Sequence, residues 1–237
     1  MPNFTAEGIT NGASFVAGIT PGSIVTIFGT ALTKDVTGIV QASGLPLPTE
    51  LRGTSVAVSG IPSPLFAIAN ERGQEQINLQ VPYEITGQPT ATVVVNNNGV
   101  SNSPVQVNVL PTHPGIFTVD GTAGAILHGS NFQPVSASNP AAKGEVVVLY
   151  ATGLGPISQA PRTGMPALSS PLSLTAFPPV VTVGGIGADV LFSGLAPGFV
   201  GLNQVNIRVP ASAPSGNLDV VIQTDGRAGK AVKMAVQ

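Results

Sequence analysis

One seven-residue pattern occurs twice in this chain, and it limits the fold more than any other feature. The copies read Gln-Ile-Asn-Leu-Gln-Val-Pro at 76–82 and Gln-Val-Asn-Ile-Arg-Val-Pro at 204–210. Aliphatic and polar residues alternate in both, which indicates a half-buried β-strand whose aliphatic side chains face a core and whose polar side chains face outward. Each closing proline ends the strand pairing, because proline has no N–H to donate.

The repeat extends beyond this strand in both directions. Downstream, 92–99 matches 219–226, and the two segments end in Asn-Gly and Asp-Gly, the dipeptides of type I′ hairpins. Upstream, 22–28 matches 144–150. We therefore expect two copies of one unit, residues 1–111 and 112–237, joined by a short, stiff connection that contains Pro111 and Pro114.

Short runs of β-branched residues between glycines and prolines predict strands throughout the chain, and no segment of helical length keeps a period of 3.6. The predicted strands are 24–28, 55–58, 77–81, 90–95 and 105–109, followed by 146–150, 180–183, 205–209, 218–223 and 232–236. The sequence predicts an all-β fold of two tandem immunoglobulin-like β-sandwich domains.

Composition excludes several classes of function. Charged residues make up 8% of the 237 residues, against about 25% in ordinary soluble domains, and the net charge is -2. No basic patch for phosphates is expected, so nucleic acid is not a predicted partner. No apolar run approaches the roughly 18 residues that span a bilayer. A nearly neutral surface gives little repulsion between copies, which favours self-association.

The residues also give no catalytic or cofactor chemistry, so we predict neither an enzyme nor a cofactor. Cysteine is absent, and the two histidines, His113 and His128, have no helical i, i+4 partner and no carboxylate cluster of familiar metal-site spacing. We interpret them as solvated or hydrogen-bonded loop residues. No G-x-S-x-G motif occurs, and the segment 153–156 is interpreted as a turn.

The repeated outward amides are the one candidate contact face. Gln76 and Asn78 in the first copy correspond to Gln204 and Asn206 in the second. The alternative, that these amides bond neighbouring backbone at a strand edge, is the more ordinary behaviour of such side chains. Sugar binding generally uses aromatic platforms, and the chain has 5% aromatic residues and no tryptophan.

The chain resembles, over nearly its full length, a family of uncharacterised C-terminal domains found in exported proteins of Solibacter-type acidobacteria. The resemblance is carried by the segments 11–15, 21–29, 76–82 and 150–156, and most specifically by 193–204, Ser-Gly-Leu-Ala-Pro-Gly-Phe-Val-Gly-Leu-Asn-Gln. The Pro-Gly-Ser-strand-Gly pattern also looks like IPT/TIG immunoglobulin-like domains. The resemblance implies an exported sandwich protein and lends no catalytic residues; the first residues show no signal peptide.

Three hypotheses of function follow. The first is a non-catalytic extracellular or cell-surface interaction module whose partner is another protein. The second is a self-assembling subunit of a filament or surface layer, in which residues 1–15 or the C-terminal strand add to a neighbour's sheet. The third, without support from the residues, is a carbohydrate-binding accessory domain of an exported enzyme.

Overall fold

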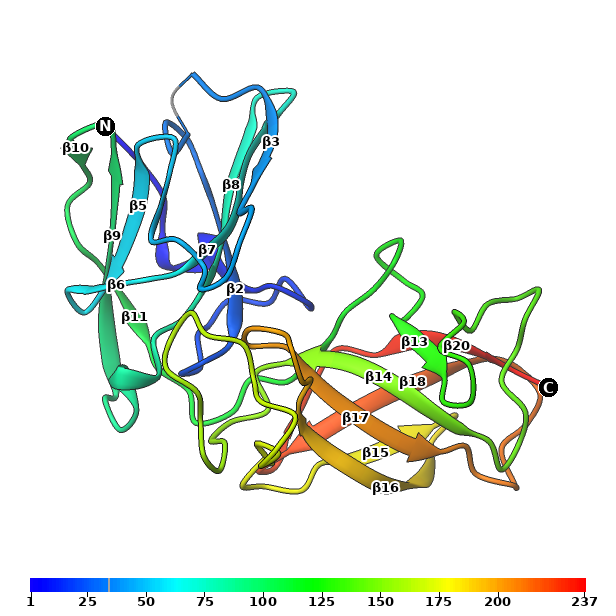
Figure 1. The fold of residues 1–237 in the computed structure, drawn as a ribbon. Coiled ribbons are helices and arrows are strands. Elements are labelled where there is room, and N and C mark those ends of the chain that lie inside the picture. Colours follow the sequence, from blue (N-terminus) through cyan, green and yellow to red (C-terminus); the bar gives the residue numbers. More distant parts are fainter. Residues whose placement is uncertain (34) are drawn as a thin grey trace.

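The computed structural model describes residues 1–33 and 35–237 and consists of two β-sandwich domains arranged as an L (Figure 1). Each domain has its own hydrophobic core. Buried apolar residues from Phe4 to Val107 form the core of the first domain, and buried apolar residues from Ile116 to Val236 form the core of the second. The predicted fold class is confirmed, and the division at residues 111 and 112 stays a prediction.

The first domain packs two antiparallel sheets face to face. One sheet has the strand order β1-β2-β8-β7-β3; in the other, β10-β9-β5-β4 is extended by β11 on β9 and by β6 on β5. The first sheet comprises β1 (Ile9–Asn11), β2 (Ile24–Gly29), β8 (Gln74–Gln80), β7 (Leu65–Glu71) and β3 (Gly38–Gln41). The second comprises β10 (Val100–Ser101), β9 (Thr90–Asn97), β5 (Thr54–Val58), β4 (Glu50–Leu51), β11 (Val105–Asn108) and β6 (Ile61–Pro62).

The second domain forms one continuous path of strands that folds over a single core. Its order is β12-β14-β17-β16-β15-β18-β19, with β13 on β14 and β20 on β18. These strands are β12 (Gly115–Ile116), β13 (Ile126–His128), β14 (Val146–Thr152), β15 (Val180–Val183), β16 (Ile186–Leu195), β17 (Asn203–Arg208), β18 (Gly216–Thr224), β19 (Arg227–Ala228) and β20 (Val232–Val236).

Strand β16 distinguishes the second domain from the first. It pairs with β15 through its first residues and with β17 through its last, with a bulge between Val190 and Phe192. The corresponding part of the first domain is split into β6 and β7. Pro62 and Pro64 explain the split, because neither residue can donate a backbone hydrogen bond across a continuous strand.

The predicted strands and hairpins agree with the structure. All ten predicted strands overlap observed ones, and both predicted hairpins have positive φ at their two central residues. The φ angles are 51° and 84° at Asn98-Gly99 and 48° and 74° at Asp225-Gly226, as a type I′ turn requires. Among the described elements, the sequence did not predict the two short 3-10 helices, η1 (Ala6–Gly8) and η2 (Tyr83–Ile85), or the strands β1, β3, β4, β6, β7, β10, β12, β13, β16 and β19.

Both terminal strands are already paired on two sides. On the edge of β20 away from β18, the carbonyl of Lys233 accepts a hydrogen bond from the N–H of Gly124, and the N–H of Lys233 donates to the carbonyl of Thr122. Both distances are 2.9 Å. The edge of β1 away from β2 is bonded to the segment around Val16. Strand addition by either terminus to a neighbour would therefore require these hydrogen bonds to break first.

In the described ranges, no helix has the length and apolar character needed to cross a membrane.

Candidate functional site

The joint between the domains is built from the ends of their central strands. The start of β2 meets the end of β14, where the N–H of Ile24 donates to the Thr152 hydroxyl at 2.9 Å. Near the connection, the side-chain amide of Asn11 donates to the carbonyl of His113 at 2.6 Å. Hydrogen bonds from both the strand ends and the connection therefore join the two domains here.

Gln80, the last residue of β8, is the central polar side chain of this joint. Its Oε1 accepts a 2.7 Å hydrogen bond from the N–H of Gly164, and its Nε2 lies 3.4 Å from the carbonyl oxygen of Gly22. The side chain is fully buried. The strand alternation predicted an outward polar residue at this position. Gln80 does lie on the outer face of the strand, but the 163–164 loop of the second domain covers this face, so the side chain is buried and not exposed to solvent.

Helix η2 supplies the next contacts. The backbone N–H of Tyr83 donates to the Thr163 hydroxyl at 3.1 Å, and that hydroxyl donates to the Glu84 carboxylate at 2.7 Å. The Tyr83 ring packs on Gly22, where any Cβ would lie 2.0 Å from ring atom Cε1. Burial raises the pKa of the Tyr83 hydroxyl well above its usual value, because the ionised form would lose its hydration.

A groove opens beside this joint. Its volume is about 420 Å³, and its walls come from the first domain and from the 156–160 segment of the second. Across the described residues, every side chain that lines it is uncharged, and most are apolar. Residues that define the groove are Pro21, Tyr83, Pro89, Leu110, Pro111 and Ile157. Size, apolar walls and position between domains are typical of ligand sites.

The predicted amide face lies elsewhere. Gln76 and Asn78 are on β8, where the Thr26 hydroxyl donates to Asn78 at 2.9 Å, and both side chains are half-buried. Gln204 and Asn206 are on β17 and bond each other at 2.9 Å. Each contact thus lies within one sheet, and none of the four residues lines the groove. A contact function for this face stays a prediction.

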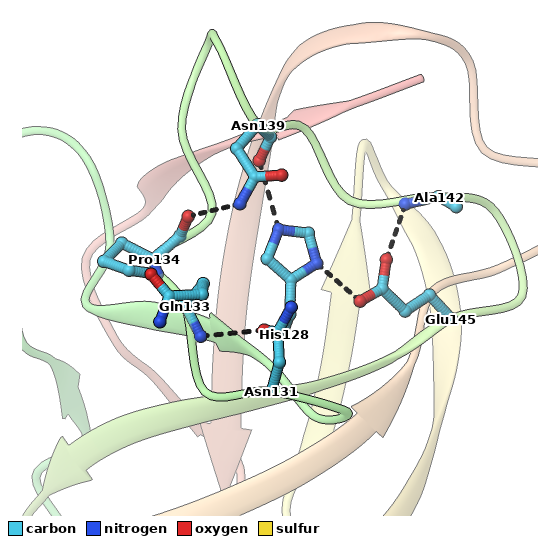
Figure 2. Close-up of polar contacts among 7 residues, drawn as sticks. All are labelled: His128, Asn131, Gln133, Pro134, Asn139, Ala142 and Glu145. Carbon is cyan, nitrogen blue, oxygen red and sulfur yellow. Dashed lines mark hydrogen bonds and ion pairs between the residues drawn. The ribbon is translucent and has the colours of Figure 1, made fainter.

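His128, the last residue of β13, is buried in a polar cluster that the sequence did not predict (Figure 2). Its Nδ1 lies 2.6 Å from a carboxylate oxygen of Glu145, and its Nε2 lies 3.2 Å from the carbonyl oxygen of Asn139. The other Glu145 oxygen accepts from the N–H of Ala142 at 2.8 Å. Both ring nitrogens face hydrogen-bond acceptors, so neither is free to bind a metal or to activate a nucleophile.

The cluster instead fastens the 129–142 segment to the start of β14. His128 and Glu145 are 17 residues apart, and no spacing rule for strands would have brought them together. The expectation that the histidines are hydrogen-bonded agrees with the structure, since His113 Nε2 also lies 3.1 Å from the carbonyl oxygen of Val16. Among residues 1–33 and 35–237, no three His, Cys, Asp or Glu side chains gather closely enough to hold a metal ion.

The fold thus defines the protein as a tandem of immunoglobulin-like β-sandwich domains. No family model and no curated protein matches its sequence. The chain is similar to several solved structures, among them SGBP-B of the mixed-linkage glucan utilization locus of Bacteroides ovatus, in complex with a mixed-linkage heptasaccharide. It is 11% identical, with a TM-score of 0.34, over 92% of this chain and 43% of that one.

Two further structures are similar at the same level. SGBP-B from a xyloglucan utilization locus of Bacteroides uniformis is 13% identical over 99% of this chain and 49% of that one, with a TM-score of 0.30. Domains 5–6 of the S-layer protein SbsC are 14% identical over 100% and 98%, with a TM-score of 0.28. This chain spans less than half the length of the two Bacteroides proteins. Likenesses this distant carry no argument about function.

Proposed function

We propose that the chain is a non-catalytic interaction module, extracellular or on a cell surface, that binds its partner in the groove at the joint. The observation that carries this proposal is an uncharged groove of about 420 Å³ beside a joint that hydrogen bonds hold in place. A groove between two fixed domains is organised before its ligand arrives, which lowers the entropic cost of binding.

The chemistry of the residues supports a binding role over a catalytic one. The described histidines are both held by backbone or carboxylate oxygens, and the groove is lined by uncharged residues. Acid–base catalysis needs a titratable group within hydrogen-bond reach of the substrate. The extracellular setting rests on the family resemblance of the sequence.

The groove walls also favour one class of partner. Tyr83 is the one aromatic residue among the lining residues, and four of the others are prolines. Sugar sites generally stack rings on aromatic platforms and hydrogen-bond the hydroxyls, and this lining offers few groups for either. An uncharged, largely apolar ligand therefore fits the groove better than a glycan.

The test uses Nile red, a neutral apolar dye whose fluorescence rises in apolar surroundings, with a cello-oligosaccharide as the glycan probe. We expect saturable dye binding that Ala160→Trp abolishes, because the new side chain fills the groove from its rim. Ala211→Trp is the matched control, at an exposed position outside the groove that corresponds in the repeat to Tyr83. Dye binding that survives Ala160→Trp, or binding of the oligosaccharide alone, would overturn the proposal.

The residues of the joint support a head-to-tail filament less well than an interaction module. If a neighbour repeated the same contact at the far end of the second domain, Arg208 and Ala211 would replace Gln80 and Tyr83. The far end therefore lacks the buried amide and the ring that form the joint. A different surface favours self-association, and it leads to the inference below.

A further inference from the structure

We infer that the chain pairs with a second copy of itself through one exposed apolar surface of the second domain. This surface, the β16 patch, consists of seven large apolar side chains that are each 38–61% exposed. Its members are Met165, Leu168, Leu172, Leu174, Phe177, Leu191 and Phe199. Isolated exposed apolar residues are normal on proteins, whereas a group of this size marks an interaction surface.

Hydrogen bonds lay the 165–177 segment along the end of β16 and the turn that follows it, so that residues 172–174 lie beside β16 and residues 167–168 lie beside Phe199. The N–H of Leu195 donates to Ser173, and the N–H of Thr175 donates to Ser193, at 2.8 and 3.1 Å. Further along, the N–H of Ala167 donates to Phe199 at 2.9 Å and the N–H of Gly198 donates to Ala167 at 2.8 Å.

These bonds fix the backbone on both sides of the exposed residues. Ser173 is buried between Leu172 and Leu174, so the two leucines point away from the domain. The patch is thus a surface presented by a hydrogen-bonded scaffold.

Charge is nearly absent from this part of the chain. Between Thr163 and Ile207, Asp189 is the one charged residue in the sequence. A partner that recognised this surface through ion pairs would find almost nothing to bind. The second copy offers the matching chemistry, since it brings an identical uncharged apolar surface and adds little Coulomb repulsion at a net charge of -2.

The area agrees with a pair of copies. Aromatic side chains carry roughly 150–250 Å² each and leucine and methionine somewhat less, so seven that are about half exposed present on the order of 500 Å². Two patches that meet face to face bury on the order of 1,000 Å², about the minimum for a biological interface and in the range of weak, reversible ones. One self-complementary patch gives an isologous contact, which closes as a two-fold dimer and does not propagate as a filament.

A lipid surface is the competing occupant. Peripheral membrane binding is strengthened by clusters of basic residues next to the apolar group. Beside the patch, the exposed Arg162 accepts a backbone hydrogen bond from Met165 at 2.9 Å, and the run from 163 to 207 contains neither lysine nor arginine. One arginine is far from the four to eight basic residues of a lipid-binding cluster, so the second copy is the better match.

Sedimentation velocity over a wide concentration range tests the inference. We expect the mass to rise from 23.7 kDa toward twice that value and then to stop. The double variant Leu168→Ser with Phe199→Ser should weaken dimerisation at least about tenfold, because central apolar contacts dominate interfaces. Val119→Ser with Phe132→Ser removes two comparably exposed apolar side chains outside the patch and should leave the dimer unchanged.

Other outcomes overturn the inference. These are a monomer at every concentration, a dimer that the patch variant does not weaken, growth beyond two copies, and binding to neutral phosphatidylcholine vesicles without dimerisation. Unchanged circular dichroism and thermal midpoints show that the variants fold. The inference does not depend on the groove: Ala160→Trp should leave the dimer intact, and the patch variant should still bind Nile red.

Discussion

The side-chain oxygen of Gln80 in the first domain accepts a 2.7 Å hydrogen bond from the backbone N–H of Gly164 in the second, and the glutamine is fully buried. Because the two residues belong to different domains, this hydrogen bond stabilises the packing of one domain against the other. Tyr83, three residues further along the chain, packs on Gly22 at the same joint and lines the groove.

Gln80→Leu should destabilise the joint by about 1–3 kcal/mol, because the N–H of Gly164 and the carbonyl of Gly22 would lose a buried partner. Urea denaturation measures the loss, and small-angle scattering should show a wider range of domain orientations. The matched control is Arg208→Leu, at the corresponding repeat position, where the side chain is exposed and donates to the carbonyl of Gly144 at 3.0 Å. Loss of this solvent-exposed hydrogen bond should cost about 0.5 kcal/mol, the low end for a single hydrogen bond. Equal effects of the two variants would contradict the role assigned to Gln80.

Gly22 and Gly144 occupy equivalent positions in the repeat, so substitutions at both allow the cost of backbone strain to be measured apart from the cost of steric overlap at the joint. Gly22 and Gly144 have φ angles of 78° and 80°, so alanine is strained at both, at a cost of about 1–2 kcal/mol. A Cβ at Gly22 would lie 2.0 Å from the Tyr83 ring, whereas a Cβ at Gly144 would have no neighbour within 4 Å.

Gly22→Ala should therefore cost about 1–3 kcal/mol more than Gly144→Ala, since only the first overpacks the joint. Chemical denaturation of the two variants side by side gives the difference directly. If both lose the same stability, the Tyr83 ring moves away without cost and does not brace the joint.

The repeat made most of the strands predictable, because alternation and turn dipeptides are local signals. Strand β7 escaped prediction since its sequence, Leu-Phe-Ala-Ile-Ala-Asn-Glu, includes alanine and asparagine, which are poor strand formers. Strand β16 escaped for a similar reason, because it contains glycines at 187 and 194.

The site was less predictable, because its contacts join residues far apart in the chain. Gln80 looks like any outward amide of a strand, and only the docking of the 163–164 loop buries it. His128 and Glu145 likewise meet only after β13 pairs with β14. The apolar residues from 165 to 199 gave no usable signal, since the sequence does not show which of them the core leaves exposed.

Tyr83 predicts how stability depends on alkaline pH. Burial raises the pKa of its hydroxyl, whereas the unfolded chain ionises it near pH 10. The neutral form stabilises the fold fully below that pH, and this contribution is lost as the pH rises above it.

Wild-type stability should thus fall more steeply above about pH 10 than that of Tyr83→Phe, which has no proton to lose there. Urea midpoints at neutral and strongly alkaline pH provide the measurement. Tyr150→Phe retains Tyr83 and should behave like the wild type. Parallel curves for the wild type and Tyr83→Phe would show that the hydroxyl reaches solvent in solution.

Mutation of the His128–Glu145 pair should cause local unfolding of the 129–142 segment and leave the rest of the second domain folded. Glu145→Ala removes the carboxylate that contacts both His128 Nδ1 and the Ala142 N–H, so the 129–142 segment loses these two contacts and keeps the backbone hydrogen bond from Gly129 to Val146 of β14. We expect a loss of about 1–3 kcal/mol and faster amide exchange at His128 and Ala142.

Asp219→Ala is the matched control, because it removes a carboxylate that pairs with Lys233 at 2.9 Å on an exposed strand face. Exposed pairs of this kind contribute about 1 kcal/mol or less, so this variant should exchange like the wild type at residues 128–142. Hydrogen exchange read by NMR distinguishes the two, since the Glu145 effect should end within the 129–142 segment and leave the core strands β17 and β18 protected. Exchange that accelerates across the whole second domain would instead assign Glu145 to the stability of the core.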